Sequence, residues 1–244
     1  MGATVPPVAL YAGAHCRQTG IMDPSSTPLH NFGPLDQLRA GRLPERLLRL
    51  LLGLWVYGLA VALLIQGTLG AAPWDVFHLG LALHLPLSLG TVMVIVSIVV
   101  LLAWIPLRQM PGLGTLANTL LVGPFADLNL AWLPLPGTMP MRVAYVLTGT
   151  IACALATALY VGAHLGPGPR DGVMTGLSRR SGWSIRRVRT GIELGVLGAG
   201  ISLGGTVGAG TLVFALGVGP LTQLFLRHLA VRLPAVANDT ARQA

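Results

Sequence analysis

Six long apolar runs constrain what this chain can fold into more than any other feature of its sequence. A helix needs about 20 mainly apolar residues to cross the hydrocarbon core of a bilayer. Six segments approach or reach that length: residues 47–66, 89–107, 113–133, 143–163, 190–206 and 209–227. The sequence therefore predicts an all-α, polytopic membrane protein whose first partner is the lipid bilayer.

The low content of charged residues and the absence of lysine exclude several classes of protein. Only 10% of the 244 residues are charged and the mean hydropathy is +0.70, whereas a soluble domain carries about 25% charged residues. All 16 cationic residues are arginines, which excludes a P-loop with its lysine and any cofactor held as a lysine Schiff base. We interpret the net charge of +8 as a topology signal and expect no nucleic-acid partner.

The two cysteines indicate neither a disulfide nor a metal site. Cys16 lies in a polar segment, whereas Cys153 lies inside an apolar run, so the two thiols are not expected to meet. The sequence contains no serine-hydrolase or metalloprotease signature. We expect no metal, no cofactor and no enzymatic activity.

Both ends of the chain differ from its apolar middle. Residues 1–38 are rich in proline, serine and glycine without apolar periodicity, which predicts a disordered cytoplasmic tail. This segment lacks the apolar core of a signal peptide, and Met22 is an alternative start to Met1. Residues 231–244 are expected to form a flexible cytoplasmic tail.

An internal repeat organises the middle of the chain. At an offset of 96 positions, residues 46–128 align with residues 142–224 without a gap, and 29 of the 83 pairs are identical. This is far more than chance pairing of Leu, Gly and Ala would give. The alignment predicts a first membrane repeat over 39–134 and a second over 135–230.

Each repeat is expected to hold three full spans and one short broken or re-entrant helix. The short helices fall within 70–86 and 166–180, where a Gly/Pro break precedes a segment too short or too polar to be a secure span. Three spans per half would insert the second half upside down, whereas four per half would make the halves parallel.

The distribution of arginines favours the inverted arrangement. Only Arg142 then lies outside, in agreement with the positive-inside rule. The loop around 67–88 has no arginine, whereas its counterpart around 163–189 has six, as expected for equivalent loops on opposite faces. Both termini are then cytoplasmic.

Several motifs resemble those of a known family. They are Leu-Gly-x-x-Pro-Trp-Asp (Leu69 to Asp75), Pro-Gly-Leu-Gly-Thr (Pro111 to Thr115) and Gly-Pro-x-Pro-Arg-Asp-Gly (Gly166 to Gly172), between a first span led by Arg46 and a glycine-rich last span. Over residues 40–228 the chain resembles the YczE/YyaS/YitT family of bacterial integral membrane proteins. The resemblance implies a multi-spanning inner-membrane protein, often described as a transporter, and supplies no substrate.

Asp75 and Asp171 occupy equivalent places, each two residues after a proline at the start of a short helix. Either they complement the positive ends of these helices, or both helices point toward the bilayer middle and form a site for an ion, a proton or a polar solute. Arg170 stands where the first repeat has Trp74. Three roles of Arg170 remain open: it neutralises Asp171, it recognises an anionic group, or it lies at the level of the lipid headgroups.

The remaining candidates lie on the long spans. Glu193 either pairs with Arg189 at i,i+4 or is a buried proton carrier. Asp127 is expected near the end of a polar pathway, and Asn118 either joins this pathway or forms an interhelical hydrogen bond. Proline inside a span breaks the hydrogen-bond ladder, which predicts helix kinks at Pro124 and Pro220.

Two functions from different classes remain open. The first is a small secondary transporter or permease for an unknown small solute or ion, with its site between the repeats. The second is a non-transporting scaffold or regulator that acts through protein partners; a lipid-modifying enzyme comes third. Polar residues that face one shared site favour the first, and polar residues buried within separate helix pairs favour the second. A homo-oligomer is compatible with either.

Overall fold

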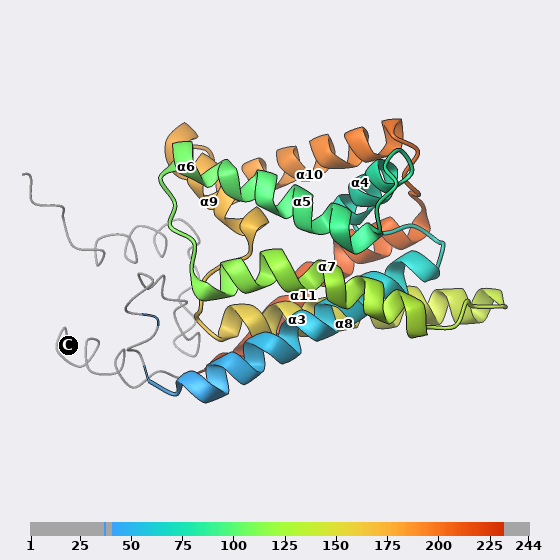
Figure 1. The fold of residues 1–244 in the computed structure, drawn as a ribbon, viewed down its shortest axis with the longest axis horizontal. Helices are drawn as coiled ribbons and strands as arrows, with labels where there is room; N and C mark the ends of the chain where they lie inside the picture. Colours follow the sequence, from blue (N-terminus) through green and yellow to red (C-terminus); the bar gives the residue numbers. More distant parts are fainter. Residues whose placement is uncertain (1–36, 38–40, 232–244) are drawn as a thin grey trace, which may run out of the picture.

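The computed structural model describes residue 37 and residues 41–231, and in these ranges it contains helices and no strand (Figure 1). The helices are α3 (Leu43–Gln66), α4 (Pro73–Ala82), α5 (Leu89–Leu102), α6 (Trp104–Leu107), α7 (Leu113–Trp132), α8 (Met139–Gly162), α9 (Pro169–Ser181), α10 (Ile185–Ser202) and α11 (Ala209–Leu229). The all-α prediction is confirmed for the described part. The tails expected at 1–38 and 231–244 lie almost entirely outside it, as do Cys16 and both candidate start residues.

The helices are arranged in two groups. The long helices α3, α7, α8 and α11 run alongside one another in the lower part of Figure 1, and α4, α5, α9 and α10 lie above them. Helix α3 packs on α7 and α8, and α8 packs on α11. In the upper group α10 packs on α4, while α5 connects the groups through its contact with α7.

Helices α3 and α8 cross closely and run antiparallel. Gly53 near the start of α3 lies against the backbone of Tyr160 at the end of α8, and Gly149 lies against Ala60 and Leu64. A Cβ atom at either glycine would come within about 3 Å of these neighbours, so the missing side chain is what allows the close approach.

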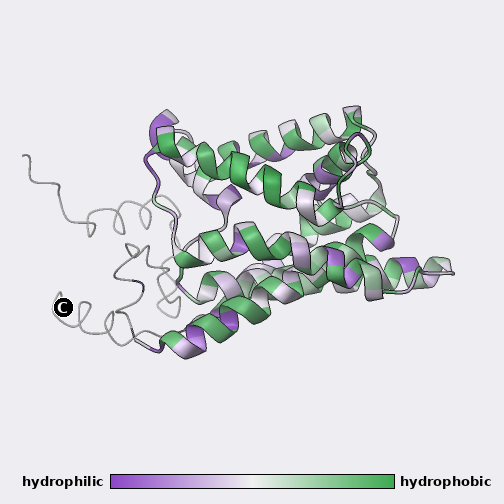
Figure 2. Cartoon of the chain, viewed as in Figure 1, coloured by the Kyte–Doolittle hydropathy of each residue, from purple (hydrophilic) through white to green (hydrophobic). Residues whose placement is uncertain are grey.

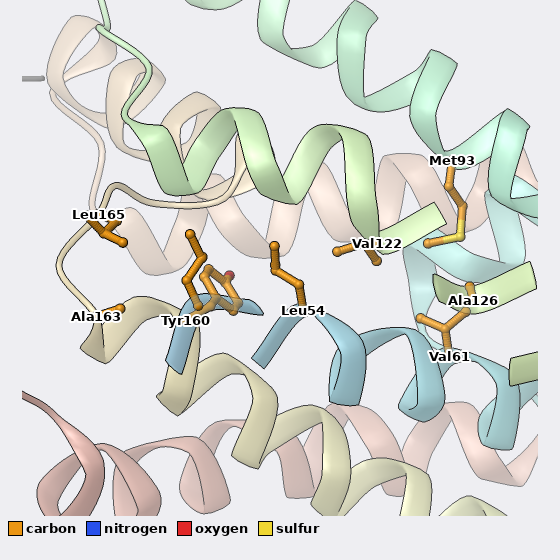
Figure 3. Packing of buried hydrophobic residues seen from close by; sticks show 9 residues of the cluster. Leu54, Val61, Met93, Val122, Ala126, Tyr160, Ala163 and Leu165 are labelled. Carbon is orange, nitrogen blue, oxygen red and sulfur yellow. The ribbon is translucent and has the colours of Figure 1, made fainter. Parts of the chain in front are cut away.

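The largest cluster of buried apolar side chains joins four helices. Figure 3 shows Leu54 and Val61 of α3 facing Val122 and Ala126 of α7, with Met93 of α5 beside them. The other members are Leu50, Tyr160, Ala163 and Leu165. This core fixes α3 against α7 and α8, and Met93 attaches α5 to it.

The outer faces of the helices are apolar. Figure 2 shows hydrophobic residues around the helices as well as between them, and the exposed ones include Leu216 and Trp132, with 77% and 83% of their surfaces accessible. Such a surface fits lipid rather than water.

Four segments are long and apolar enough to cross a membrane: Leu43–Gln66, Leu89–Leu107, Met139–Gly162 and Ala209–Leu229. They coincide with four of the six spans expected from the sequence. The other two form α7 and α10, which are 20 and 18 residues long. Polar side chains explain the difference, because α7 carries Asn118, Asp127 and Asn129, and α10 begins with an arginine cluster.

Both short helices follow a sharp break, as predicted. Gly70 and Gly166 have φ angles of 110° and 114°, which a residue with a side chain rarely adopts. Pro73 and Pro169 then begin α4 and α9, where a proline ring suits the first turn and no amide donor is lost. The breaks are therefore built from local backbone preferences.

A buried arginine ties the start of α3 to the end of α8. Arg46 has no accessible surface; its Nε donates to the carbonyl oxygen of Ala163 and its Nη2 to that of His164, both at 2.8 Å. Arg142, 96 positions later, donates instead to the Thr68 hydroxyl at 2.8 Å and is partly exposed. No local sequence pattern distinguishes Arg46 from the more exposed arginines beside it.

We expect Arg46→Lys to lower the free energy of unfolding by about 2–3 kcal/mol, since an ammonium group cannot replace the planar fork and leaves buried carbonyls unsatisfied. Arg142→Lys is the matched control and should have a much smaller effect because its site is exposed. Thermal unfolding in detergent measures both. Equal destabilisation by the two variants would contradict the anchoring role of Arg46.

Helices α7 and α11, which start 96 positions apart, differ in how closely a neighbouring helix approaches them. Gly123 of α7 touches the carbonyl oxygen of Gly90 of α5, and a Cβ atom at either position would overlap the other backbone. Gly219 of α11, 96 positions after Gly123, has no neighbour within 4 Å of an added Cβ. Helices α5 and α7 are thus closely packed, whereas α11 is open at the equivalent place.

This difference predicts opposite effects of one substitution. Gly123→Ala should cost about 1–3 kcal/mol of stability because the methyl group overpacks a backbone contact. Gly219→Ala should stabilise by up to about 1 kcal/mol, because alanine is the better helix former. Chemical or thermal unfolding of the two variants in the same detergent measures the difference, and destabilisation by Gly219→Ala would show that this face is packed.

Candidate functional site

The first turns of α4 and α9 meet inside the protein. Arg170 at the start of α9 stacks over the ring of Trp74 at the start of α4, with its guanidinium carbon 4.7 Å from the ring centroid. These two residues are 96 positions apart. The contact brings the N-terminal ends of the two short helices, and with them the positive ends of two helix dipoles, within the reach of two side chains.

Asp75 and His78 form a buried polar pair on one face of α4. Asp75 is 3% exposed and His78 is fully buried. Asp75 Oδ1 lies 3.6 Å from His78 Nδ1, which is close enough for charge attraction and too long for a hydrogen bond. The i,i+3 spacing places both side chains on the same side of the helix.

Several polar atoms of this pair and its neighbour lack a hydrogen-bond partner. They are Asp75 Oδ1, both ring nitrogens of His78 and Trp74 Nε1, all of them buried. More than nine in ten buried polar groups in proteins are partnered, and leaving one unpaired costs about 1–3 kcal/mol. These atoms are grouped on one helical turn. Such a group of unsatisfied donors and acceptors is typical of a site for water, a proton or a polar ligand.

Asp171 has a different environment. Tyr160 donates its hydroxyl to Asp171 Oδ2 at 3.3 Å, and the carboxylate is also within the electrostatic reach of Arg170 and Arg189. Tyr57 lies edge-on to Tyr160, with ring centroids 6.2 Å apart. The two aspartates are equivalent in sequence position, but one is paired with a histidine and the other with a hydroxyl group and arginines.

The central polar group is therefore formed by residues from four helices: Tyr57 of α3, Trp74, Asp75 and His78 of α4, Tyr160 of α8, and Arg170 and Asp171 of α9. Cys153 of α8 is a buried free thiol that adjoins this central polar group through Tyr57. Asn118 of α7 lies close to Gly168, the N-cap of α9.

Two sequence candidates lie elsewhere and have local roles. Asp127 Oδ1 accepts the backbone N–H of Gly90 at 2.7 Å and so caps the start of α5. Glu193 accepts from Arg189 Nε at 2.9 Å on a partly exposed face, with 32% of its side chain accessible. The geometry of Glu193 is that of an i,i+4 surface pair.

The two prolines lie within continuous helices. Pro124 is part of α7 and Pro220 is part of α11. Both rings are exposed on the outside of the molecule, so neither proline is in the central polar group.

Sequence reasoning missed three of the seven residues of the central polar group: Tyr57, His78 and Tyr160. His78 was detectable, because it lies three residues after Asp75 on the same helical face. Tyr57 and Tyr160 had no such signal, because they come from α3 and α8 and meet the aspartates only through packing. Among the described residues, no three His, Cys, Asp or Glu side chains are grouped so that they could hold a metal ion.

Comparison with known proteins places the chain in a family. Residues 44–227 match the model of a family of unknown function, DUF6198. The chain is 37% identical over 190 residues to an uncharacterized protein of Haemophilus influenzae, covering 78% of this chain and 87% of the relative. It is 35% identical over 177 residues to the uncharacterized membrane protein YczE of Bacillus subtilis, covering 72% and 80% of the two chains. No solved structure matches.

The chain has four apolar helices of membrane-spanning length. It is a membrane protein that belongs to the DUF6198 family and is related to YczE.

Proposed function

We propose that this protein is a small secondary transporter, not an enzyme, that carries a small polar solute or ion through a site between two inverted halves. The observation that carries the proposal is the meeting of α4 and α9: two helix N-termini, Arg170 and the unpartnered Asp75–His78 pair converge in the interior. Transporters commonly bind their substrates at the ends of discontinuous helices near the bilayer middle.

A duplicated origin of the halves is supported by the helix boundaries. Helices α3 and α8 are both 24 residues long and begin 96 positions apart, and α4 and α9 begin at Pro73 and Pro169. Helices α5 and α10, and α7 and α11, also begin 96 positions apart. Repetition of each helix start at one offset extends the sequence alignment to the backbone.

A two-fold relation between the halves is supported by reciprocal contacts. The N–H of Gly114 donates to the carbonyl oxygen of Leu165 at 2.7 Å, and the N–H of Gly210 donates to that of Leu69 at 2.7 Å. The two donors are 96 positions apart in the sequence, and so are the two acceptors, so each bond is the counterpart of the other in the repeat alignment. Such exchange of partners is the mark of a two-fold interface, and the antiparallel crossing of α3 and α8 agrees with halves of opposite orientation.

The difference between the halves suggests how access to the site alternates. Helix α5 is closed on α7 at Gly90 and Gly123, whereas Gly219 of α11 faces open space. In transporters with inverted repeats, exchange of the two conformations between the halves moves the opening from one membrane face to the other. Closure of α10 on α11, coupled to release of α5 from α7, is the corresponding step here.

A scaffold without transport is the competing function. It requires the polar residues only for packing within separate helix pairs. The Arg170–Trp74 contact argues against this, because it joins the two short helices, and because Asp75 Oδ1 and both His78 ring nitrogens have no hydrogen-bond partner in another helix.

Opposite orientation of the halves predicts opposite labelling of single cysteines. In a chain with Cys16 and Cys153 replaced, Leu85→Cys and Ser181→Cys should react with a membrane-impermeant maleimide from opposite faces. Both positions are exposed. His228→Cys, at the end of α11, should label from the same face as Ser181→Cys and is the control. Labelling of Leu85→Cys and Ser181→Cys from one face would contradict the inversion.

The site itself is tested by comparing metabolites in cells that carry the wild type or a variant. Asp75→Asn and Asp171→Asn should reach the membrane in normal amounts and abolish the metabolite differences that the wild type produces relative to cells without it. Glu193→Gln is the matched control, because its carboxylate is paired on the surface, and it should retain the wild-type profile. Normal profiles with both aspartate variants, or their loss from the membrane to equal extents, would contradict a binding site and favour a capping role.

A further inference from the structure

A basic cavity lies where α6 meets the last turns of α9. Its volume is about 620 Å³, and its lining includes the guanidinium-bearing residues Arg108, Arg179 and Arg180 and no acidic residue. It is distinct from the central polar group, since Arg179 follows Arg170 by nine residues, or about 14 Å along the helix. The proposed transport site does not use this cavity.

The fold builds the cavity by packing α6 directly on the glycine face of α9. Trp104 Nε1 donates to the carbonyl oxygen of Pro169 at 2.9 Å, and its ring lies against Gly172. One turn later Leu107 lies against Gly176. The next turn of α9 therefore places Arg179 and Arg180 beside the end of α6.

Two of the arginines at the cavity, Arg108 and Arg180, make no ion pair with a described acidic residue. Arg108 ends α6 in a left-handed conformation with φ 52°. Arg180 donates from Nη1 to the carbonyl oxygen of Pro106 at 3.2 Å.

The equivalent corner of the first half shows that this packing does not require arginines. In the repeat alignment, the counterparts of Arg179, Arg180 and Arg108 are Leu83, His84 and Gly204. At that corner the end of α4 meets the end of α10, and His84 Nε2 lies 3.2 Å from the carbonyl oxygen of Leu203. One corner is thus apolar or weakly polar and the other carries three fixed positive charges around a cavity.

We propose that this cavity binds the phosphate group of an anionic ligand, supplied either by an anionic phospholipid or by a free phosphate ester. Guanidinium groups bind phosphate oxygens through paired hydrogen bonds, and basic pockets between membrane helices are suited to lipid headgroups. Ile105, also in the cavity lining and 73% exposed, gives the ligand an apolar neighbour on the lipid side.

Binding is measured on the purified full chain in a neutral detergent, so that no charged membrane surface contributes. The probes are short-chain phosphatidylglycerol, short-chain phosphatidylcholine and glycerol 3-phosphate, followed by calorimetry and by native mass spectrometry. Phosphatidylglycerol should bind with one-to-one stoichiometry. Arg108→Gln with Arg180→Gln should weaken it by roughly 10- to 30-fold, at about a factor of five for each arginine.

Charge-matched variants separate the cavity from general positive charge. Arg186→Gln with Arg187→Gln removes two exposed charges at the start of α10 and should leave binding nearly unchanged. The double variant Arg108→Lys with Arg180→Lys keeps both positive charges but loses the paired N–H donors of the guanidinium groups, so it should weaken binding by an intermediate amount. This variant also tests the cavity if the glutamine double variant folds poorly. Binding of glycerol 3-phosphate in competition with the lipid identifies a free phosphate ester, and its failure to bind identifies a lipid headgroup. Equal weakening by the cavity and α10 pairs, or equal binding of phosphatidylcholine and phosphatidylglycerol, would overturn the proposal.

Discussion

Each backbone break that precedes a short helix leaves polar groups that lipid cannot satisfy, and in this protein the start of a long helix satisfies one of them at each break. The carbonyl oxygens of Leu69 and Leu165 accept from the N–H groups of Gly210 and Gly114. Irregular backbone in a membrane protein is stable only when it is buried in protein in this way. These two hydrogen bonds dock the segments before α4 and α9 onto the starts of α11 and α7.

This docking has an electrostatic consequence. It brings Trp74 and Arg170 into contact and encloses Asp75 and His78 among apolar helices. Unpartnered polar groups in such surroundings reduce stability. Ionisable residues inside a membrane protein are for this reason candidates for a functional site.

Helices that start 96 residues apart share their starting positions but not their surfaces. Gly90 allows α5 to approach α7, whereas Arg186 occupies the position 96 residues later and α11 is left open at Gly219. Three arginines likewise surround the α6–α9 cavity, where the positions 96 residues away hold leucine, histidine and glycine. Aligned helices of this protein therefore differ most in their arginines and in how closely a neighbour packs on them.

The sequence by itself determined the class of protein, the position of nearly every helix and the two breaks. Hydropathy, proline at a helix start and glycine at a positive φ are local properties that do not depend on partners. Only the tertiary structure decided what each polar residue does. Asp127 caps α5, Glu193 pairs with Arg189, and Asp171 meets Tyr160 of another helix. Arg46, which reads as one more arginine near the headgroups, is buried against α8. Partners of this kind come from helices distant in sequence, and their identity follows from how the helices cross, which no local pattern encodes.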